Sequence, residues 1–149
     1  MGKVIEKVYL LNFGAELSES IIEDIKKKEN ILELEQIRIK RSLNLKKHSI
    51  YIQVHDIVEE FKDYFTSKHP VIINLPGLPI YAACLITEIS ALTGKLPIIV
   101  ECVKDYDSDG VFSDFKFKRL YNLDRERAYS RESYKSGGRK KLKEETENA

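Results

Sequence analysis

The fold is decided by one stretch near the middle of the chain, Val71-Ile72-Ile73-Asn74-Leu75-Pro76-Gly77-Leu78-Pro79. Its first part is a continuous apolar run, which is typical of a strand covered on both faces of a sheet. Pro76 and Gly77 end that strand, and Pro79 suits the first turn of a helix, where a backbone N–H is not needed. The helix is expected to reach Thr93, with Gly94 as its C-terminal cap. The stretch therefore predicts a strand, a tight turn and a helix, the repeating unit of an α/β fold.

The same alternation continues on both sides of this stretch. Apolar runs predict strands over residues 8–12 and 97–103, alternation of apolar and polar residues predicts a strand over 32–40, and helical spacing predicts helices over 18–28 and 49–65. The first of these helices is expected to use Ser18 as its N-cap. Residues 112–121 alternate as in an antiparallel edge strand, with Phe115 and Phe117 inward. The order predicts a three-layer α/β fold with a mostly parallel sheet and an antiparallel edge strand.

Composition indicates one soluble domain followed by a basic tail. A chain of 149 residues suits a single domain, expected over residues 1–130. Beyond Asp124 basic residues outnumber acidic ones, so residues 131–149 are expected to form a disordered basic tail. The net charge of +1 identifies no partner.

Several features favour a cytoplasmic protein. Glu6 and Lys7 interrupt the apolar start, so no secretion signal is visible, and no apolar run reaches membrane-spanning length. Cys84 and Cys102 lie far apart in apolar runs, which predicts reduced thiols in the core. We therefore expect no membrane association.

The candidate site lies at the carboxyl ends of the first and third strands. In an open α/β sheet of strand order 2-1-3-4, ligands bind at that point because the strand order reverses there. The two strands end in Asn12-Phe13-Gly14 and Asn74-Leu75-Pro76-Gly77. Asparagine amides donate and accept hydrogen bonds, glycine permits close approach, and the following helix N-terminus favours an anion such as phosphate. The alternative is a structural turn, in which Asn74 caps the helix and the prolines stiffen the chain.

Familiar cofactor and metal motifs are missing from the sequence. Neither G-x-G-x-x-G nor G-x-x-x-x-G-K-[ST] occurs, which argues against ordinary NAD or ATP chemistry, and no cofactor is expected. Residues 105–110 match the first half of a calcium loop, but Lys116 stands where the bidentate glutamate belongs. A hairpin turn with an Asp-Gly step explains them better. His48, His55 and His69 have no metal-ligand spacing, so no metal site is expected.

Basic residues follow several of the predicted strands. Lys40 and Arg41 follow the second strand, Lys104 ends the fourth, and Arg125 and Arg127 follow the edge strand. Each one alone is explained by a solvated surface charge. Together they are expected to face the phosphates of a nucleotide ligand.

The combination of motifs resembles a known family. An apolar first strand ends in Asn12-Phe13, a second apolar run enters Asn-Leu-Pro-Gly-Leu, and an alanine-rich helix leads to Leu96-Pro97 and a further apolar strand. Over residues 7–123 the chain resembles the small ancillary proteins of type III CRISPR systems, specifically the Csx family numbered fifteen. The resemblance implies a Rossmann-like protein that binds cyclic oligoadenylate, most of all cyclic tetra-adenylate, and lowers its free level by sequestration.

The expected ligand contacts combine the two turns with nearby basic and aromatic residues. They are Asn12, Phe13, Gly14, Lys40, Arg41, Asn74, Pro76, Gly77, Leu78, Tyr81 and Arg125. An asparagine amide bonds adenine bidentately, and Phe13 and Tyr81 either stack on bases or pack in the core. Because the ring is symmetric, the resemblance also implies a homodimer, or an assembly that the ligand drives.

Two other functions stay open. The first is a metal-independent ring nuclease, in which the ligand's own 2′-hydroxyl attacks the adjacent phosphate while Lys40, Arg41 and Arg125 stabilise the charge. No general base is identifiable, which favours binding without cleavage. The second is a nucleic-acid or protein adaptor that acts through the basic tail, although no stable binding of duplex nucleic acid is expected.

Overall fold

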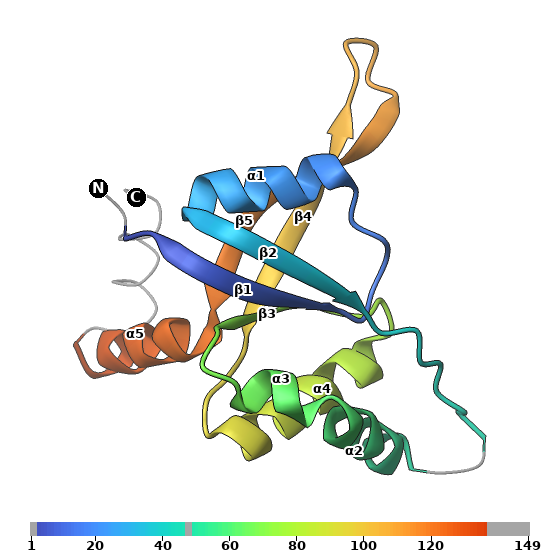
Figure 1. The fold of residues 1–149 in the computed structure, drawn as a ribbon, viewed down its shortest axis with the longest axis vertical. Helices are drawn as coiled ribbons and strands as arrows, with labels where there is room; N and C mark the ends of the chain where they lie inside the picture. The colour runs from blue at the N-terminus through green and yellow to red at the C-terminus, as the bar shows by residue number, and fades with distance from the viewer. Residues whose placement is uncertain (1–2, 47–48, 137–149) are drawn as a thin grey trace.

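The computed structural model describes residues 3–46 and 49–136, which form one α/β sheet structure (Figure 1). The elements are β1 (Ile5–Asn12), α1 (Glu19–Glu29), β2 (Ile31–Arg38), α2 (Ile50–Glu60), α3 (Lys62–Thr66), β3 (Val71–Asn74), α4 (Pro79–Thr93), β4 (Ile98–Tyr106), β5 (Phe112–Asn122) and α5 (Leu123–Ser136). The sequence-based prediction of alternating strands and helices is confirmed.

The sheet has the strand order β2-β1-β3-β4-β5. The first four strands are parallel, and β5 pairs antiparallel to β4, as predicted for the edge strand. Asn12 of β1 is the register partner of Asn74 of β3, so these strands end side by side. Strand β3 is short and pairs with β4 through Ile72 and Ile73, while β4 runs on to Tyr106.

Helices cover both faces of the sheet and make it a three-layer structure (Figure 1). On one face, Ile21, Ile22 and Ile25 of α1 pack against the strands. Ser18 caps this helix as predicted, because its hydroxyl accepts a hydrogen bond from the N–H of Ile21 (3.3 Å). On the other face, α2 and α4 contribute Val54 and Leu85, among others, to a second core.

The helix predicted over residues 49–65 is divided in two. Helix α2 ends at Glu60, and α3 begins at Lys62. Phe61 lies between them with φ −106° and ψ 15°, outside the helical range, and its half-buried ring packs against the core. The spacing of apolar residues did not reveal this break because both short helices present apolar side chains to the same core.

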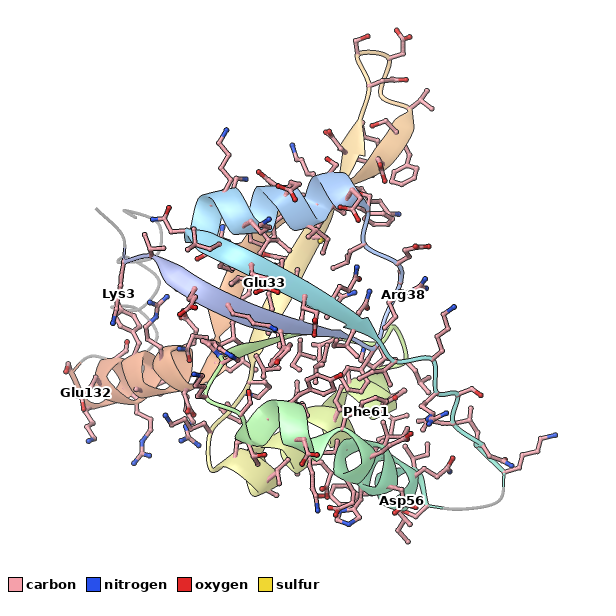
Figure 2. The ribbon with its side chains drawn as sticks, viewed as in Figure 1. Lys3, Glu33, Arg38, Asp56, Phe61 and Glu132 are labelled. Carbon is pink, nitrogen blue, oxygen red and sulfur yellow. The ribbon has the colours of Figure 1, made fainter. Side chains whose placement is uncertain are left out.

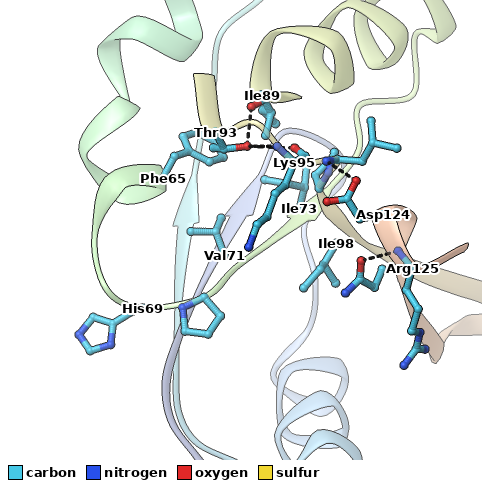
Figure 3. A pocket seen from close by; sticks show the side chains of 14 residues that line it. Phe65, His69, Val71, Ile73, Ile89, Thr93, Lys95, Ile98, Asp124 and Arg125 are labelled. Carbon is cyan, nitrogen blue, oxygen red and sulfur yellow. Dashed lines mark hydrogen bonds between the residues drawn. The ribbon is translucent and has the colours of Figure 1, made fainter. Parts of the chain in front are cut away.

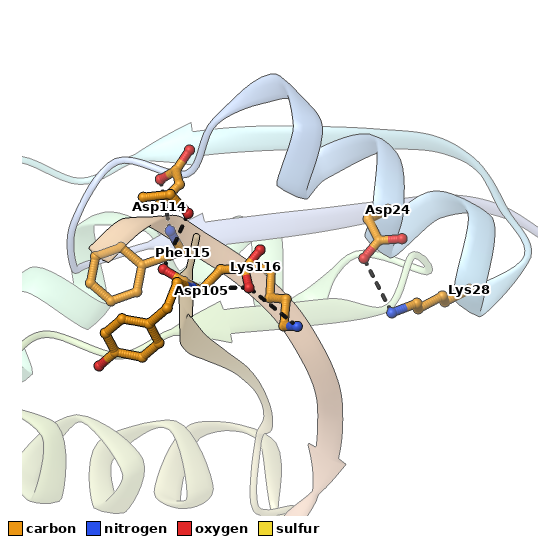
Figure 4. Close-up of polar contacts among 8 residues, drawn as sticks. Asp24, Lys28, Asp105, Asp114, Phe115 and Lys116 are labelled. Atoms are coloured by element: carbon orange, nitrogen blue, oxygen red, sulfur yellow. Dashed lines mark hydrogen bonds and ion pairs between the residues drawn. The ribbon is translucent and has the colours of Figure 1, made fainter. Parts of the chain in front are cut away.

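The outer parts of β4 and β5 form a hairpin arm, here defined as residues 104–115, which projects beyond the helical layers (Figure 1). Lys116 at its base forms an ion pair with Asp105 across the strands (3.6 Å; Figure 4). The predicted inward position holds for Phe117 but is wrong for Phe115, whose side chain is 46% exposed. The reason is that the arm extends past the end of α1, so no second layer covers it.

The C-terminal helix α5 continues through Ser136, beyond the predicted domain boundary at residue 130. The rest of the predicted tail, residues 137–149, lies outside the described residues. Cys84 and Cys102 are free thiols and only partly buried. Within residues 3–46 and 49–136, no helix has both the length and the apolar character needed to cross a membrane.

Charged side chains lie on the outer surfaces of the layers, as Figure 2 shows for Glu33, Asp56 and Glu132. The carboxylate of Glu88 departs from this pattern. Glu88 of α4 is only 8% exposed, and its Oε2 lies 3.0 Å from Nδ1 of His55 on α2. The hydrogen bond and the charge of Glu88 raise the pKa of His55 above its usual value. This pair therefore links α2 to α4 on the outer side of the second core.

Replacement of a core leucine tests the packing of α4. Leu85 is fully buried, whereas Leu92 on the same helix is 36% exposed. Leu85→Ala is expected to lower the free energy of unfolding by about 2–5 kcal/mol because it leaves a cavity. Leu92→Ala should change it by less than about 0.5 kcal/mol. Urea denaturation followed by circular dichroism measures both, and equal losses would contradict this packing.

Replacement of Glu88 tests the ion pair with His55. Glu88→Gln is expected to lower the pKa of His55, measured by NMR titration of its ring protons, and Glu60→Gln on α2 serves as the control. Folding raises the pKa of His55. The ion pair therefore stabilises the folded protein fully at pH values below about 6.5, which is the pKa of histidine in the unfolded chain. That stabilisation is lost as the pH rises through the folded pKa. The stability difference between wild type and Glu88→Gln should accordingly shrink from pH 5.5 to pH 8, and a constant difference would refute the linkage.

Candidate functional site

The two predicted turns are joined by the side chain of Asn12. Its Oδ1 accepts hydrogen bonds from the N–H of Gly14 and from Nδ2 of Asn74, both at 2.9 Å. Its Nδ2 donates to the carbonyl of Ala15 (3.0 Å) and to Oε1 of Gln36 (2.9 Å). The side chain is 2% exposed, and its amide group has a partner for every donor and both acceptor positions. Asn12 is thus a structural link between the turns, which corrects its expected role as a ligand contact.

Gly14 is required where the two turns approach each other. A Cβ atom at this position would lie 2.4 Å from the carbonyl oxygen of Leu75, far closer than van der Waals contact. The glycine therefore serves the packing of the β1–α1 loop on the β3–α4 turn. The close approach is to the protein's own backbone, whereas the sequence had suggested approach to a ligand.

The expected aromatic contacts are buried in the core. Phe13 and Tyr81 are 7% and 6% exposed, and their rings meet edge to face with centroids 6.2 Å apart. Burial raises the pKa of Tyr81, whose hydroxyl has no hydrogen-bond partner among the described residues. Of the two roles expected for Phe13 and Tyr81, the structure shows packing in the core.

A crevice of about 450 Å³ opens where β3 has ended and β4 and β5 continue. We call it the carboxyl-end crevice. It is lined by Ala15 and Leu17 of the β1–α1 loop, by Asn74, Leu75 and Gly77 of the β3–α4 turn, by residues 99–102 of β4, and by Phe115 and Tyr121 of β5. The crevice exists because β3 is short, and it adjoins the predicted switch point between β1 and β3.

Glu101 is the residue of this crevice that the sequence analysis did not select. Its Oε1 is buried and has no hydrogen-bond partner among the described residues. Arg119 pairs with it at 3.7 Å, too long for a hydrogen bond, and burial together with the nearby Glu101 carboxylate raises the pKa of Tyr121. Burial and the charge of Glu101 together raise the pKa of the neighbouring Cys102 thiol. A charged residue inside the apolar run 98–103 was the signal that could have revealed this site.

Helix α4 begins at the crevice without a side-chain cap. Its N-cap residue, Leu78, has an extended backbone; its carbonyl accepts a hydrogen bond from the N–H of Ala82 (3.0 Å), but its side chain makes no capping hydrogen bond. The first-turn N–H groups that follow Pro79 have no intrahelical partner and carry the positive end of the helix dipole. Gly77 is exposed, and a Cβ there would meet nothing within 4 Å. Pro76, Gly77 and Leu78 therefore lie where the sequence predicted them, beside a helix end that can accept an anion.

The basic residues at the carboxyl end of the sheet differ in whether an acidic residue already pairs with them. Lys40 is exposed and forms no ion pair with any described residue. Arg41 forms an ion pair with Glu60 of α2, and its Nε lies 3.1 Å from Oε2 of Glu60. Arg38, labelled in Figure 2 at the end of β2, pairs with Glu16 at 3.4 Å. Of the two predicted cations on this side, only Lys40 is free to meet a phosphate.

Arg125 lies at the opposite end of the sheet, which corrects its predicted place in the site. The antiparallel strand β5 returns toward the amino ends of the parallel strands, and Asn122 pairs with Ile98, the first residue of β4. Arg125 follows in α5 and lines a separate cavity there. Arg127 on the same helix pairs with Asp124 (3.6 Å).

The predicted hairpin turn is confirmed at the tip of the arm. Oδ1 of Asp107 accepts hydrogen bonds from the N–H groups of Asp109 (2.9 Å) and Val111 (3.0 Å), and Gly110 has a positive φ of 78°. This acceptor oxygen is thus used within the turn itself. Across the part of the chain that the structure describes, no three His, Cys, Asp or Glu side chains form a group that could hold a metal ion.

No protein-family model and no curated protein matches this chain. The function is therefore argued from the residues of the crevice.

Two glycine variants test the contact between the turns. Gly14→Ala is expected to lower the free energy of unfolding by about 1–3 kcal/mol, because the added methyl group clashes with the backbone of Leu75. Gly77→Ala, in open space three residues after Asn74, should change it by less than about 0.5 kcal/mol. Urea denaturation provides the comparison. Similar stabilities for the two variants would show that the turns are not in close contact.

Proposed function

We propose that this protein binds cyclic oligoadenylate, above all cyclic tetra-adenylate, in the carboxyl-end crevice and lowers its free level by sequestration in the cytoplasm. One observation carries the proposal: an uncapped helix N-terminus and a buried carboxylate oxygen without a hydrogen-bond partner adjoin the same crevice. The resemblance to the Csx family numbered fifteen supplies the identity of the ligand.

The crevice offers complementary groups to the two parts of a nucleotide. The start of α4 suits phosphate oxygens. Lys40, which follows β2 and does not line the crevice, would meet a phosphate of a ring that extends beyond it. The carboxylate of Glu101 accepts hydrogen bonds from donors such as an adenine amino group or a ribose hydroxyl. Asn74 supplies a further acceptor, since only its Nδ2 is used in the contact with Asn12. In this arrangement Glu101 meets the base or sugar, because a phosphate beside it would be repelled.

The size of the crevice supports a homodimer around one ring. A volume of about 450 Å³ lies within the range of ordinary small-molecule pockets. A ring of four nucleotides is larger than such a ligand, so one crevice holds only a part of it. Two copies related by a two-fold axis would enclose matching halves of the symmetric ring.

A second candidate function, the metal-independent ring nuclease, is favoured by Glu101. The carboxylate of Glu101, whose Oε1 accepts no hydrogen bond from the described residues, can accept the proton of a ribose 2′-hydroxyl as a general base. The 2′-oxygen would then attack the adjacent phosphorus, the bond to the 5′-oxygen would break, and that oxygen would take up a proton. The products would be linear chains that end in a 2′,3′-cyclic phosphate.

Calorimetric titration with cyclic tri-, tetra- and hexa-adenylate tests binding. Gly77→Asp places a negative charge at the start of α4 and is expected to weaken binding at least tenfold. Aspartate near a helix N-terminus is compatible with the helix, so weaker binding would not reflect loss of α4. Leu92→Asp, near the other end of the same helix, serves as the control. If no ring binds, or if both variants bind like the wild type, the proposed site is wrong.

Product analysis separates sequestration from cleavage. Under sequestration, the ring is recovered intact by chromatography after prolonged incubation with wild-type protein. Linear products formed over many turnovers would instead establish the nuclease. In that case Glu101→Gln should abolish cleavage while the variant still binds the ring.

A further inference from the structure

A second, larger cavity of about 600 Å³ lies at the amino ends of β3 and β4 (Figure 3). We call it the amino-end cavity. It is bounded by the ends of α3 and α4, the start of α5 and the segment between α4 and β4. Apart from Arg125, none of its lining residues was among the expected ligand contacts.

The cavity combines apolar walls with cationic side chains. Its walls include Phe65, Val71, Ile73, Ile89 and Ile98, its cationic groups are Lys95 and Arg125, and the imidazole of His69 also lines it. Figure 3 shows Lys95 extending toward Val71, with His69 and Arg125 on either side. Three separate segments of the chain therefore bring positive or protonatable groups to one apolar space.

These cations have no acidic partner. Lys95, Arg125 and His69 form no ion pair with any residue of the described ranges. The carboxylate that lines the cavity, Asp124, accepts a hydrogen bond from the N–H of Leu96 (3.1 Å) and pairs with Arg127 (3.6 Å). Its charge is already engaged, so the cavity keeps an excess of positive charge beside low-dielectric walls, which strengthens its attraction for anions.

We propose that the amino-end cavity binds a small organic anion whose apolar body fills the walls and whose carboxylate or phosphate meets Lys95 and Arg125. The volume falls within the range of small-molecule sites, which are mostly apolar with a few polar groups that orient the ligand. A neutral apolar ligand would leave the cations unused, and an inorganic anion would leave the walls unfilled. This inference does not depend on the function of the carboxyl-end crevice.

Matched pairs of probes test the proposal by NMR titration of the full chain. Octanoate is compared with octanol, and adenosine monophosphate with adenosine, so that each pair differs in the anionic group. Binding at the cavity should shift the backbone amide signals of the residues in the range 93–98 that carry an N–H, which excludes Pro97. At least one anion is expected to bind there at least tenfold more tightly than its neutral partner. The pair that shows this effect identifies the source of the anion as an aliphatic carboxylate or a nucleoside phosphate.

Variants that keep the apolar stem test the role of charge. Lys95→Met and Arg125→Met should each weaken anion binding about tenfold, whereas Lys104→Met on the hairpin arm should leave it unchanged. Gly77→Asp should also bind the probe like the wild type, which separates this cavity from the carboxyl-end crevice. Equal binding of the charged and neutral probes, no shift at residues 93–98, or wild-type binding by both Met variants would overturn the proposal.

Discussion

The amide of Asn12 is the contact on which the arrangement of the site depends. A buried amide must find partners for its polar atoms, because leaving one unsatisfied costs about 1–3 kcal/mol. Asn12 finds them in Gly14, Ala15, Gln36 and Asn74, and so joins three neighbouring strands and both turns at one point. That network holds the β1–α1 loop against the β3–α4 turn. The carboxyl-end crevice opens beside it, where β3 stops and β4 continues.

The two ends of the sheet differ in chemistry because the strands differ in length and direction. At the carboxyl end, β3 stops early and leaves Glu101 on the longer β4 beside the uncapped start of α4. At the amino end, the antiparallel β5 leads into α5, and Arg125 of α5 lines the same cavity as Lys95. One end thus offers acceptor groups and a helix dipole, and the other offers cations above apolar walls. The two proposed sites therefore lie at opposite ends of the same sheet.

The elements of the fold were largely predictable from local patterns. Ser18 marked the start of α1, Pro79 and Gly94 bounded α4, and the continuous apolar runs identified the parallel strands. The predictions that failed concern residues whose environment depends on contacts with distant segments of the chain. Phe61 interrupts a pattern that reads as one helix, and Phe115 alternates like a core residue although it lies beyond the covering helix. The periodicity of apolar residues indicates which side chains share one face of a helix or strand. It does not indicate how far the layer that covers this face extends.

The sequence by itself determined the alternation of strands and helices and the turn from Asn74 to Pro79, because these depend on spacing, proline and glycine along one segment. Only the tertiary structure decided the use of each side chain. In the folded protein, Asn12 hydrogen-bonds to other residues of the chain, and Phe13 and Tyr81 are buried. Arg125 lies at the other end of the sheet, and Glu101 lines the crevice. The physical reason is that a polar or aromatic residue serves either the core or a ligand according to its partners in space, and those partners come from distant segments of the chain.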